Sequence, residues 1–181
     1  MSASDPIDHR GSLRQPGAGD HTGLAVQRAE DAALPGGGRQ FPTAVEMRAY
    51  VDRVTSDPWW NETFPWAPCA VDLRVRSRSA TFSAAHLSPS GEAVIFIRRG
   101  SFDAVTVIHE LAHVAARSGL GDRGAHDAHF IAALSELWRR HLGVFAWAAL
   151  DGALRCALGD QVRPVRSPVR QRERRRFGTS R

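Results

Sequence analysis

Apolar residues recur at helical spacing in several stretches of this chain. One stretch, residues 43–56, begins with Thr43 and carries Glu46 three residues later, a pattern typical of a capping box. A second helix is expected from residue 101 through residue 117, ended by Gly119, and its nearly all-round apolar first half indicates burial. Further helices are expected at residues 21–34, 126–142 and 145–158.

Strand patterns are confined to the middle of the chain. Residues 71–76 alternate strictly between apolar and charged side chains, which predicts a half-buried strand with residues 80–84 as its hairpin partner. The continuous apolar run at residues 93–97 predicts a buried strand. A Pro-rich segment before these strands holds an aromatic cluster, interpreted as a satellite core on the sheet or as the wall of a substrate site: Trp59, Trp60, Phe64 and Trp66.

Length and composition favour one folded domain between two unfolded ends. The 181 residues are enough for one sizeable core. Residues 1–20 and the arginine-rich tail at residues 160–181 show no apolar periodicity, so we expect both to be disordered around a domain at residues 21–159. Cys69 and Cys156 are isolated, which favours two small core side chains over a disulfide or a metal-binding pair.

Charge is distributed unevenly along the chain. All 24 basic residues are arginine, which, with many Ala, Gly and Pro residues, is typical of a GC-rich genome such as that of an actinobacterium. Residues 162–181 hold eight arginines and a single acid, Glu173, so the basic character belongs to the tail. No apolar run reaches the ~18 residues that span a membrane, and the N-terminus lacks the apolar segment of a signal peptide. We therefore expect a cytoplasmic protein without a membrane partner.

The chemically distinctive segment is HELAH at residues 109–113. On a helix His109 and His113 lie on one face, so both imidazoles can bind one ion. A catalytic Zn²⁺ has three protein ligands and a water, and Glu110 can take the proton of that water during attack on a carbonyl. HExxH arises by chance in roughly 1% of chains this long, and buried imidazoles need a compensating partner. The motif therefore predicts a zinc site with Glu110 as catalytic base.

The third ligand must follow His113. Gly119 stands where a metzincin needs histidine, which excludes that class and leaves several candidates: Asp122, His126, Asp127, His129 and Glu136. On a helix at residues 126–142, His126 would lie about 65° from the centre of the apolar stripe and His129 about 125°. This favours His126 as the ligand and His129 as an outer-shell or substrate-facing group. Glu136 is the alternative ligand, in a gluzincin-like site.

HELAH at residues 109–113, followed by HDAHF at residues 126–130, resembles the HELxH…HGxxF pattern of SprT-like zinc metalloproteases. The sequence is more similar still to a small actinobacterial family of HExxH metallohydrolases, through residues 49–54, Trp59-Trp60 and the strand before the motif. The likeness covers roughly residues 22–155 and implies a zincin-like α+β fold, with a small mixed sheet packed on the motif helix. Its third-ligand histidine falls on His126. Asp127 departs from the usual glycine, and this affects the shape of the loop and the outer shell.

The leading hypothesis is a zinc metallohydrolase, specifically a metallopeptidase that cleaves peptide or amide bonds. An extended substrate would lie along an edge strand, for which residues 93–97 are the candidate. The donor that stabilises the oxyanion is left open among His129, Arg123 and Arg98. The alternative is a nucleic-acid-associated SprT-like protein, or a non-catalytic zinc-binding module, that uses the basic tail to bind phosphates. Glu110 argues against a non-catalytic module, because a structural zinc site needs no base.

Overall fold

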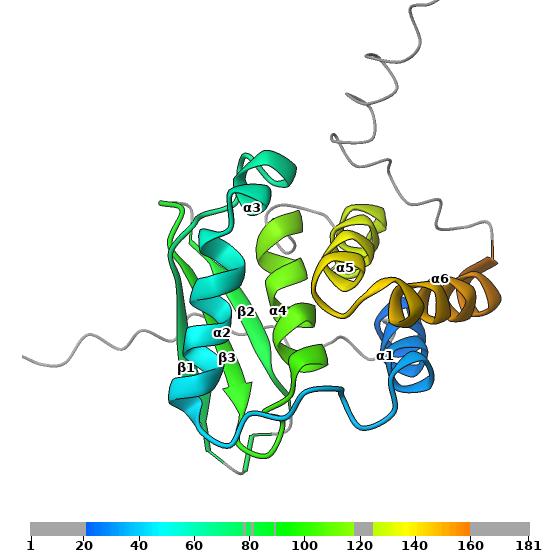
Figure 1. The fold of residues 1–181 in the computed structure, drawn as a ribbon, viewed down its shortest axis with the longest axis horizontal. Helices are drawn as coiled ribbons and strands as arrows, with labels where there is room; N and C mark the ends of the chain where they lie inside the picture. The colour runs from blue at the N-terminus through cyan, green and yellow to red at the C-terminus, as the bar shows by residue number, and fades with distance from the viewer. Residues whose placement is uncertain (1–20, 78, 81, 89, 118–124, 160–181) are drawn as a thin grey trace, which may run out of the picture.

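The computed structural model describes residues 21–77, 79–80, 82–88, 90–117 and 125–159. This part of the chain has a mixed α and β architecture, as expected (Figure 1). Its elements in chain order are α1 (His21–Ala33), α2 (Ala44–Ser56), α3 (Pro58–Thr63), β1 (Val71–Arg76), β2 (Ala84–Leu87), β3 (Ala93–Arg98), α4 (Ala104–Ala116), α5 (Ala128–His141) and α6 (Val144–Leu158). The predictions of disorder at residues 1–20 and 160–181 lie outside the described residues. The helix expected to end at Gly119 ends earlier, at Ala116, because Arg117 takes the left-handed conformation that caps it.

The sheet has the strand order β1-β3-β2. β1 runs parallel to β3, with Val71 opposite Ala93, and β2 runs antiparallel to β3, with Ala84 opposite Phe96. The expected hairpin between residues 71–76 and 80–84 is therefore wrong, because β3 lies between β1 and β2. Alternation of apolar and polar residues encodes which face of a strand is buried, but it does not encode the strand's partner.

Residues 93–97 form the centre of the sheet, which corrects a second expectation. β3 is hydrogen-bonded on both sides, so it offers no free backbone edge to an extended substrate. The edge strands are β1 and β2, and of these β2 packs against α4.

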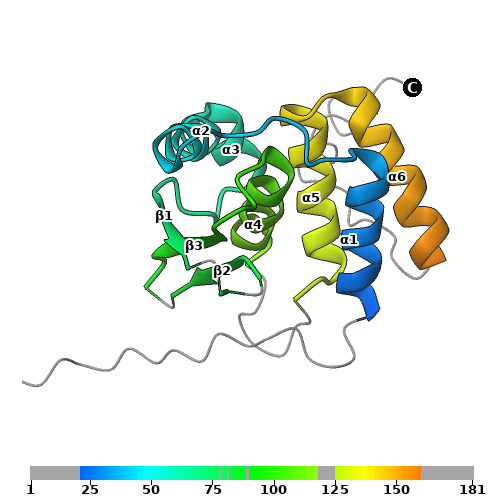
Figure 2. The same cartoon turned by 90° about the horizontal axis from the view of Figure 1, so that it is seen from below.

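The motif helix α4 lies between the sheet on one side and α5 on the other (Figures 1 and 2). Ten of its thirteen residues are buried, which confirms the predicted buried helix. α6 packs on α5 and also against α1, so helices from the two ends of the described chain lie side by side (Figure 2). None of the helices in the described ranges is long and apolar enough to cross a membrane. Cys69 and Cys156 are exposed, so their expected place in the core is wrong.

Most of the aromatic cluster belongs to the main core: Trp60 and Phe64 are core residues and Trp59 packs against them, whereas Trp66 is exposed. Trp60 and Phe64 are almost fully buried, and their rings lie 5.3 Å apart. Trp66 reaches α4, where its indole N–H donates to the Ala115 carbonyl oxygen at 2.6 Å. Trp59 reaches α5 through an edge-on contact with His141 at 5.6 Å between ring centroids. The cluster thus joins α3 and the segment after it to α4 and α5.

His141 is held in a site that disfavours its charged form. Its ring packs against Trp59, and its buried Nε2 has no hydrogen-bond partner among the described residues. Burial lowers the pKa of His141 to about 4, with further lowering by Arg140 and Arg53 that outweighs the opposite effect of Asp57. In the unfolded chain the imidazole would titrate near pH 6.5.

We expect His141 to make the fold acid-sensitive. Between pH 6.5 and 4 the unfolded chain binds a proton that the folded chain does not, so the free energy of unfolding must fall as pH falls. The free energy of unfolding should fall by about 1–2 kcal/mol between pH 7 and 4.5, a figure reduced to allow for the exposed part of the ring. Chemical denaturation at several pH values should show this extra loss in the wild type and not in His141→Gln. Parallel stability curves for the two proteins would contradict the assignment.

Candidate metal centre

α4 places the two motif histidines on one face. The helix begins after Asp103, whose carboxylate accepts hydrogen bonds from the Thr106 backbone N–H at 2.8 Å and from the Thr106 hydroxyl at 2.9 Å. This N-cap sets the start of the helix at residue 104. The sequence had suggested a start at residue 101. His109 and His113 then lie one turn apart, with their ring centroids separated by 5.0 Å.

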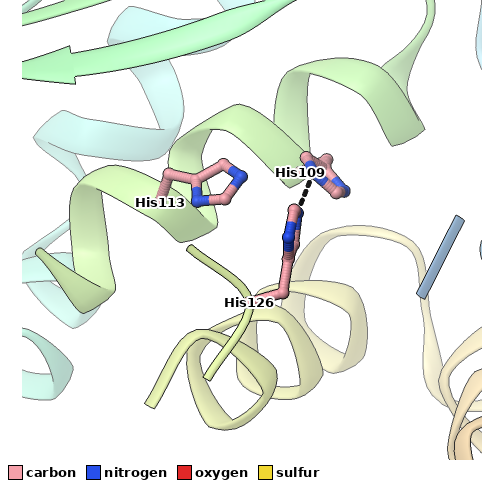
Figure 3. Close-up of side chains that lie close together, drawn as sticks. All are labelled: His109, His113 and His126. Atoms are coloured by element: carbon pink, nitrogen blue, oxygen red, sulfur yellow. Dashed lines mark hydrogen bonds between the residues drawn. The ribbon is translucent and has the colours of Figure 1, made fainter. Parts of the chain in front are cut away.

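His126 joins this pair from the turn just before α5. Its Nε2 lies 3.4 Å from Nε2 of His109, and one ring nitrogen from each of the three histidines lies within 4.8 Å of the others (Figure 3). His126 precedes the helix, because Asp127 is the N-cap of α5 and accepts hydrogen bonds from the backbone N–H groups of His129 and Phe130. The helical angle from which the sequence favoured His126 therefore does not apply, because the residue reaches the site from a turn that precedes the helix.

A buried aromatic ring supports all three imidazoles. Phe130 is fully buried, and the distances from its ring centroid to those of His109, His113 and His126 are 5.1, 4.4 and 4.8 Å. This packing restricts the rotamers of the three histidines before any ligand binds. It also explains physically why an aromatic residue belongs four positions after His126.

His109 and His113 each have a further hydrogen-bond partner outside the cluster. Nδ1 of His109 lies 2.9 Å from the carboxylate of Glu30 on α1, which leaves Nε2 toward His126. Burial lowers the pKa of His109, but the charge and hydrogen bond of Glu30 and the charge of Glu110 outweigh it and raise that pKa to about 9. Burial and the charges of its two neighbouring histidines hold the pKa of His113 well below its usual value, opposed by a hydrogen bond to the Ala125 backbone.

Glu110 is a buried acid beside the histidine cluster. Its side chain is only 4% exposed, and Oε2 has no hydrogen-bond partner within the described ranges. Burial raises the pKa of Glu110 to about 7; the charge of His109 opposes this shift and that of Glu30 adds to it. An unpaired buried carboxylate is costly for a fold, and such groups are concentrated at functional sites.

Of the other residues singled out by sequence, none in the described ranges belongs to the three-histidine group. The His129 side chain is about half exposed, and its Nδ1 lies 3.5 Å from the carboxylate of Asp127, which itself caps α5. Glu136 is buried, pairs with Arg139 at 3.2 Å and is not part of the three-histidine group. Arg98 is exposed at the end of β3. Asp122 and Arg123, together with most of the loop expected to fold over the site, lie outside the described residues.

Sequence reasoning missed Glu30. The signal was present, because Glu30 shares one face of a helix with the apolar residues Val26 and Ala29, and a carboxylate on such a face needs a partner. What the sequence could not supply was the partner, His109, which lies 79 positions further along the chain.

Three imidazoles that converge beside a buried carboxylate can bind a divalent cation and hold a proton acceptor next to it. Comparison of the chain with protein-family models, with curated proteins and with solved structures found no match. The geometry and electrostatics of the site itself therefore have to carry the functional conclusion.

Proposed function

We propose that this protein is a zinc-dependent hydrolase of peptide or amide bonds, in which His109, His113 and His126 bind the metal and Glu110 is the general base. The observation that carries the proposal is the convergence of the three imidazoles, with their nitrogens within 4.8 Å of one another. Each side chain comes from a different place in the chain or a different turn of helix, so the convergence is a product of the whole fold and not of the motif alone.

The donor set and the spacing of one of its nitrogen pairs fit Zn²⁺. Three histidines are a known ligand set for catalytic zinc, which keeps a fourth position open. Two nitrogens bound at about 2.0–2.1 Å in tetrahedral geometry are about 3.3–3.4 Å apart. Nε2 of His109 and Nε2 of His126 are 3.4 Å apart. Two buried carboxylates, Glu30 and Glu110, each with one unpartnered oxygen among the described residues, would balance the charge of a divalent cation.

Glu110 is suited to proton transfer. When bound, the metal supplies Lewis acidity that polarises a carbonyl and makes water easier to deprotonate. Glu110 adjoins a ligand in sequence, is shielded from solvent and retains one oxygen with no protein partner in the described part of the chain. It can therefore accept the proton of the attacking water and later deliver it to the leaving nitrogen.

A peptide substrate is favoured by the strand beside the site. β2 is an edge strand packed against α4, so its unpaired side can add an extended chain by backbone hydrogen bonds. An extended peptide would pair with β2, since β3 is enclosed on both sides.

Metal content tests the proposal directly. We expect elemental analysis of the purified full chain to give one zinc per molecule, and we expect His109→Ala and His113→Ala to lose it, because two remaining ligands hold zinc poorly. His86→Ala is the matched control, since this histidine is exposed on β2 and should leave the metal content unchanged. A wild-type protein that neither contains zinc nor takes it up on addition would refute the proposal.

A further inference from the structure

Glu30 contacts the candidate metal centre from the helix most distant from it in sequence. Its side chain is buried, and its Oε2 lies 2.9 Å from Nδ1 of His109. The ring nitrogen on the opposite side of His109, Nε2, is the one that lies next to His126. The imidazole is thus held between a carboxylate at its back and the histidine cluster at its front.

The chain fixes α1 with respect to α4 at a second place. The segment after α1 is hydrogen-bonded to the first turn of α4: the Val105 N–H donates to the Gly37 carbonyl and the Ala104 N–H donates to the Arg39 carbonyl, at 3.2 and 2.9 Å. Gly37 has a φ of +73°, and a Cβ there would lie 2.6 Å from the Asp103 carboxylate. Glycine therefore permits this close approach, which fixes the position of α1 relative to α4.

The burial of Glu30 is not explained by packing. Val26 and Ala29 already cover the inner face of α1, and Glu30 adds a charge whose Oε1 has no hydrogen-bond partner in the described part of the chain. A buried carboxylate with a single partner costs stability unless a functional contact requires it. Its one hydrogen bond in that part of the chain is to the ring of His109.

We propose that Glu30 is a positioning residue that orients the His109 imidazole for metal binding. Because Glu30 accepts a hydrogen bond from the Nδ1–H group, it keeps the proton on Nδ1 and leaves Nε2 as the nitrogen that gives up its proton when a metal binds, and it fixes the plane of the ring. α1 is therefore part of the metal centre although it carries no ligand. This inference rests on the proposed function in that it assumes a metal bound at His109.

Three variants of the full chain test this role. Zinc affinity, measured by competition with a fluorescent chelator, should fall by about 10–100-fold in Glu30→Ala, the range expected for loss of an outer-shell partner. Glu30→Gln keeps an amide oxygen that can accept the same hydrogen bond, so it should recover about half or more of that loss on a logarithmic scale. Asp31→Asn changes the exposed neighbour on α1 and should bind zinc as the wild type does.

A spectroscopic signature separates positioning from general loosening of the fold. The Nδ1–H proton of His109, assigned by nuclear magnetic resonance, should be slowly exchanging in the wild type, with or without zinc, and in Glu30→Gln. It should be lost to rapid exchange in Glu30→Ala. Glu30→Ala that binds zinc as tightly as the wild type, or that keeps the protected proton, would overturn the inference. Absence of zinc binding by the wild type would instead refute the proposed function.

Discussion

His126→Ala should lower zinc affinity by more than about 100-fold, whereas His129→Ala should leave it within a few-fold of the wild type. The reason is geometric: Nε2 of His126 lies 3.4 Å from Nε2 of His109, whereas His129 is not part of the cluster and has a half-exposed side chain. Loss of one of three ligands should exceed the ~10–100-fold cost of losing an outer-shell group. Competition with a chelator of known affinity measures both variants on one scale.

The pair of variants is well matched, because both histidines flank the N-cap of α5 and neither substitution removes Asp127. His126→Ala does remove a ring that packs on Phe130, so thermal unfolding of the metal-free proteins is needed to show that both still fold. Zinc retained by His126→Ala and lost by His129→Ala would reverse the assignment and would require a different course for the start of α5.

Local features of the site were predictable from the sequence. HELAH at residues 109–113 predicts one helical face with two imidazoles, and the structure has this face on a buried helix. Thr43 was expected to cap a helix, and its hydroxyl accepts the Glu46 backbone N–H at 3.2 Å. Such features depend on residues within one or two turns, so the chain itself carries the whole pattern.

Features that depend on distant residues were not predictable in the same way. The predicted pairing of the strands was wrong, because β1 pairs with β3 and not with β2, the next strand along the chain. The register of Val71 with Ala93 joins residues 22 positions apart. His126 was singled out from its angle on a helix that does not include it, and its actual location depends on Asp127 as a cap. Glu30 was missed because no residue near it in the sequence indicates that its partner is His109. In each case the missing information is a tertiary contact.

These tertiary contacts give the site its chemistry. The motif supplies two imidazoles and a carboxylate. Glu30 of α1 orients the ring of His109, and the third imidazole, that of His126, comes from the turn before α5. Phe130, from α5, holds all three rings in place. Two histidines four residues apart on a helix without these neighbours would supply only two ligands, which are too few for tight zinc binding.

Glu110→Gln should keep zinc and lose hydrolytic activity by at least about 100-fold, since general-base catalysis typically contributes ~10²–10⁴-fold. Glutamine has nearly the shape of glutamate, so the buried site around it should stay intact, but an amide cannot accept the proton of the attacking water. Cleavage of a proteome-derived peptide library, followed by mass spectrometry, measures the wild-type rate and identifies the peptides on which the variant is then compared. Elemental analysis of the same preparations reports the zinc content.

Glu136→Gln is the matched control for this experiment, because Glu136 is also buried but pairs with Arg139 on its own helix. It should keep both zinc and turnover within a few-fold, and loss of zinc from this variant would favour the gluzincin-like alternative. The inactive Glu110→Gln protein should in addition hold uncleaved substrates long enough for their capture and identification. Undiminished cleavage by Glu110→Gln, with zinc still bound, would show that another group removes the proton, and Glu110 would then be a buried acid that only balances the charge of the metal.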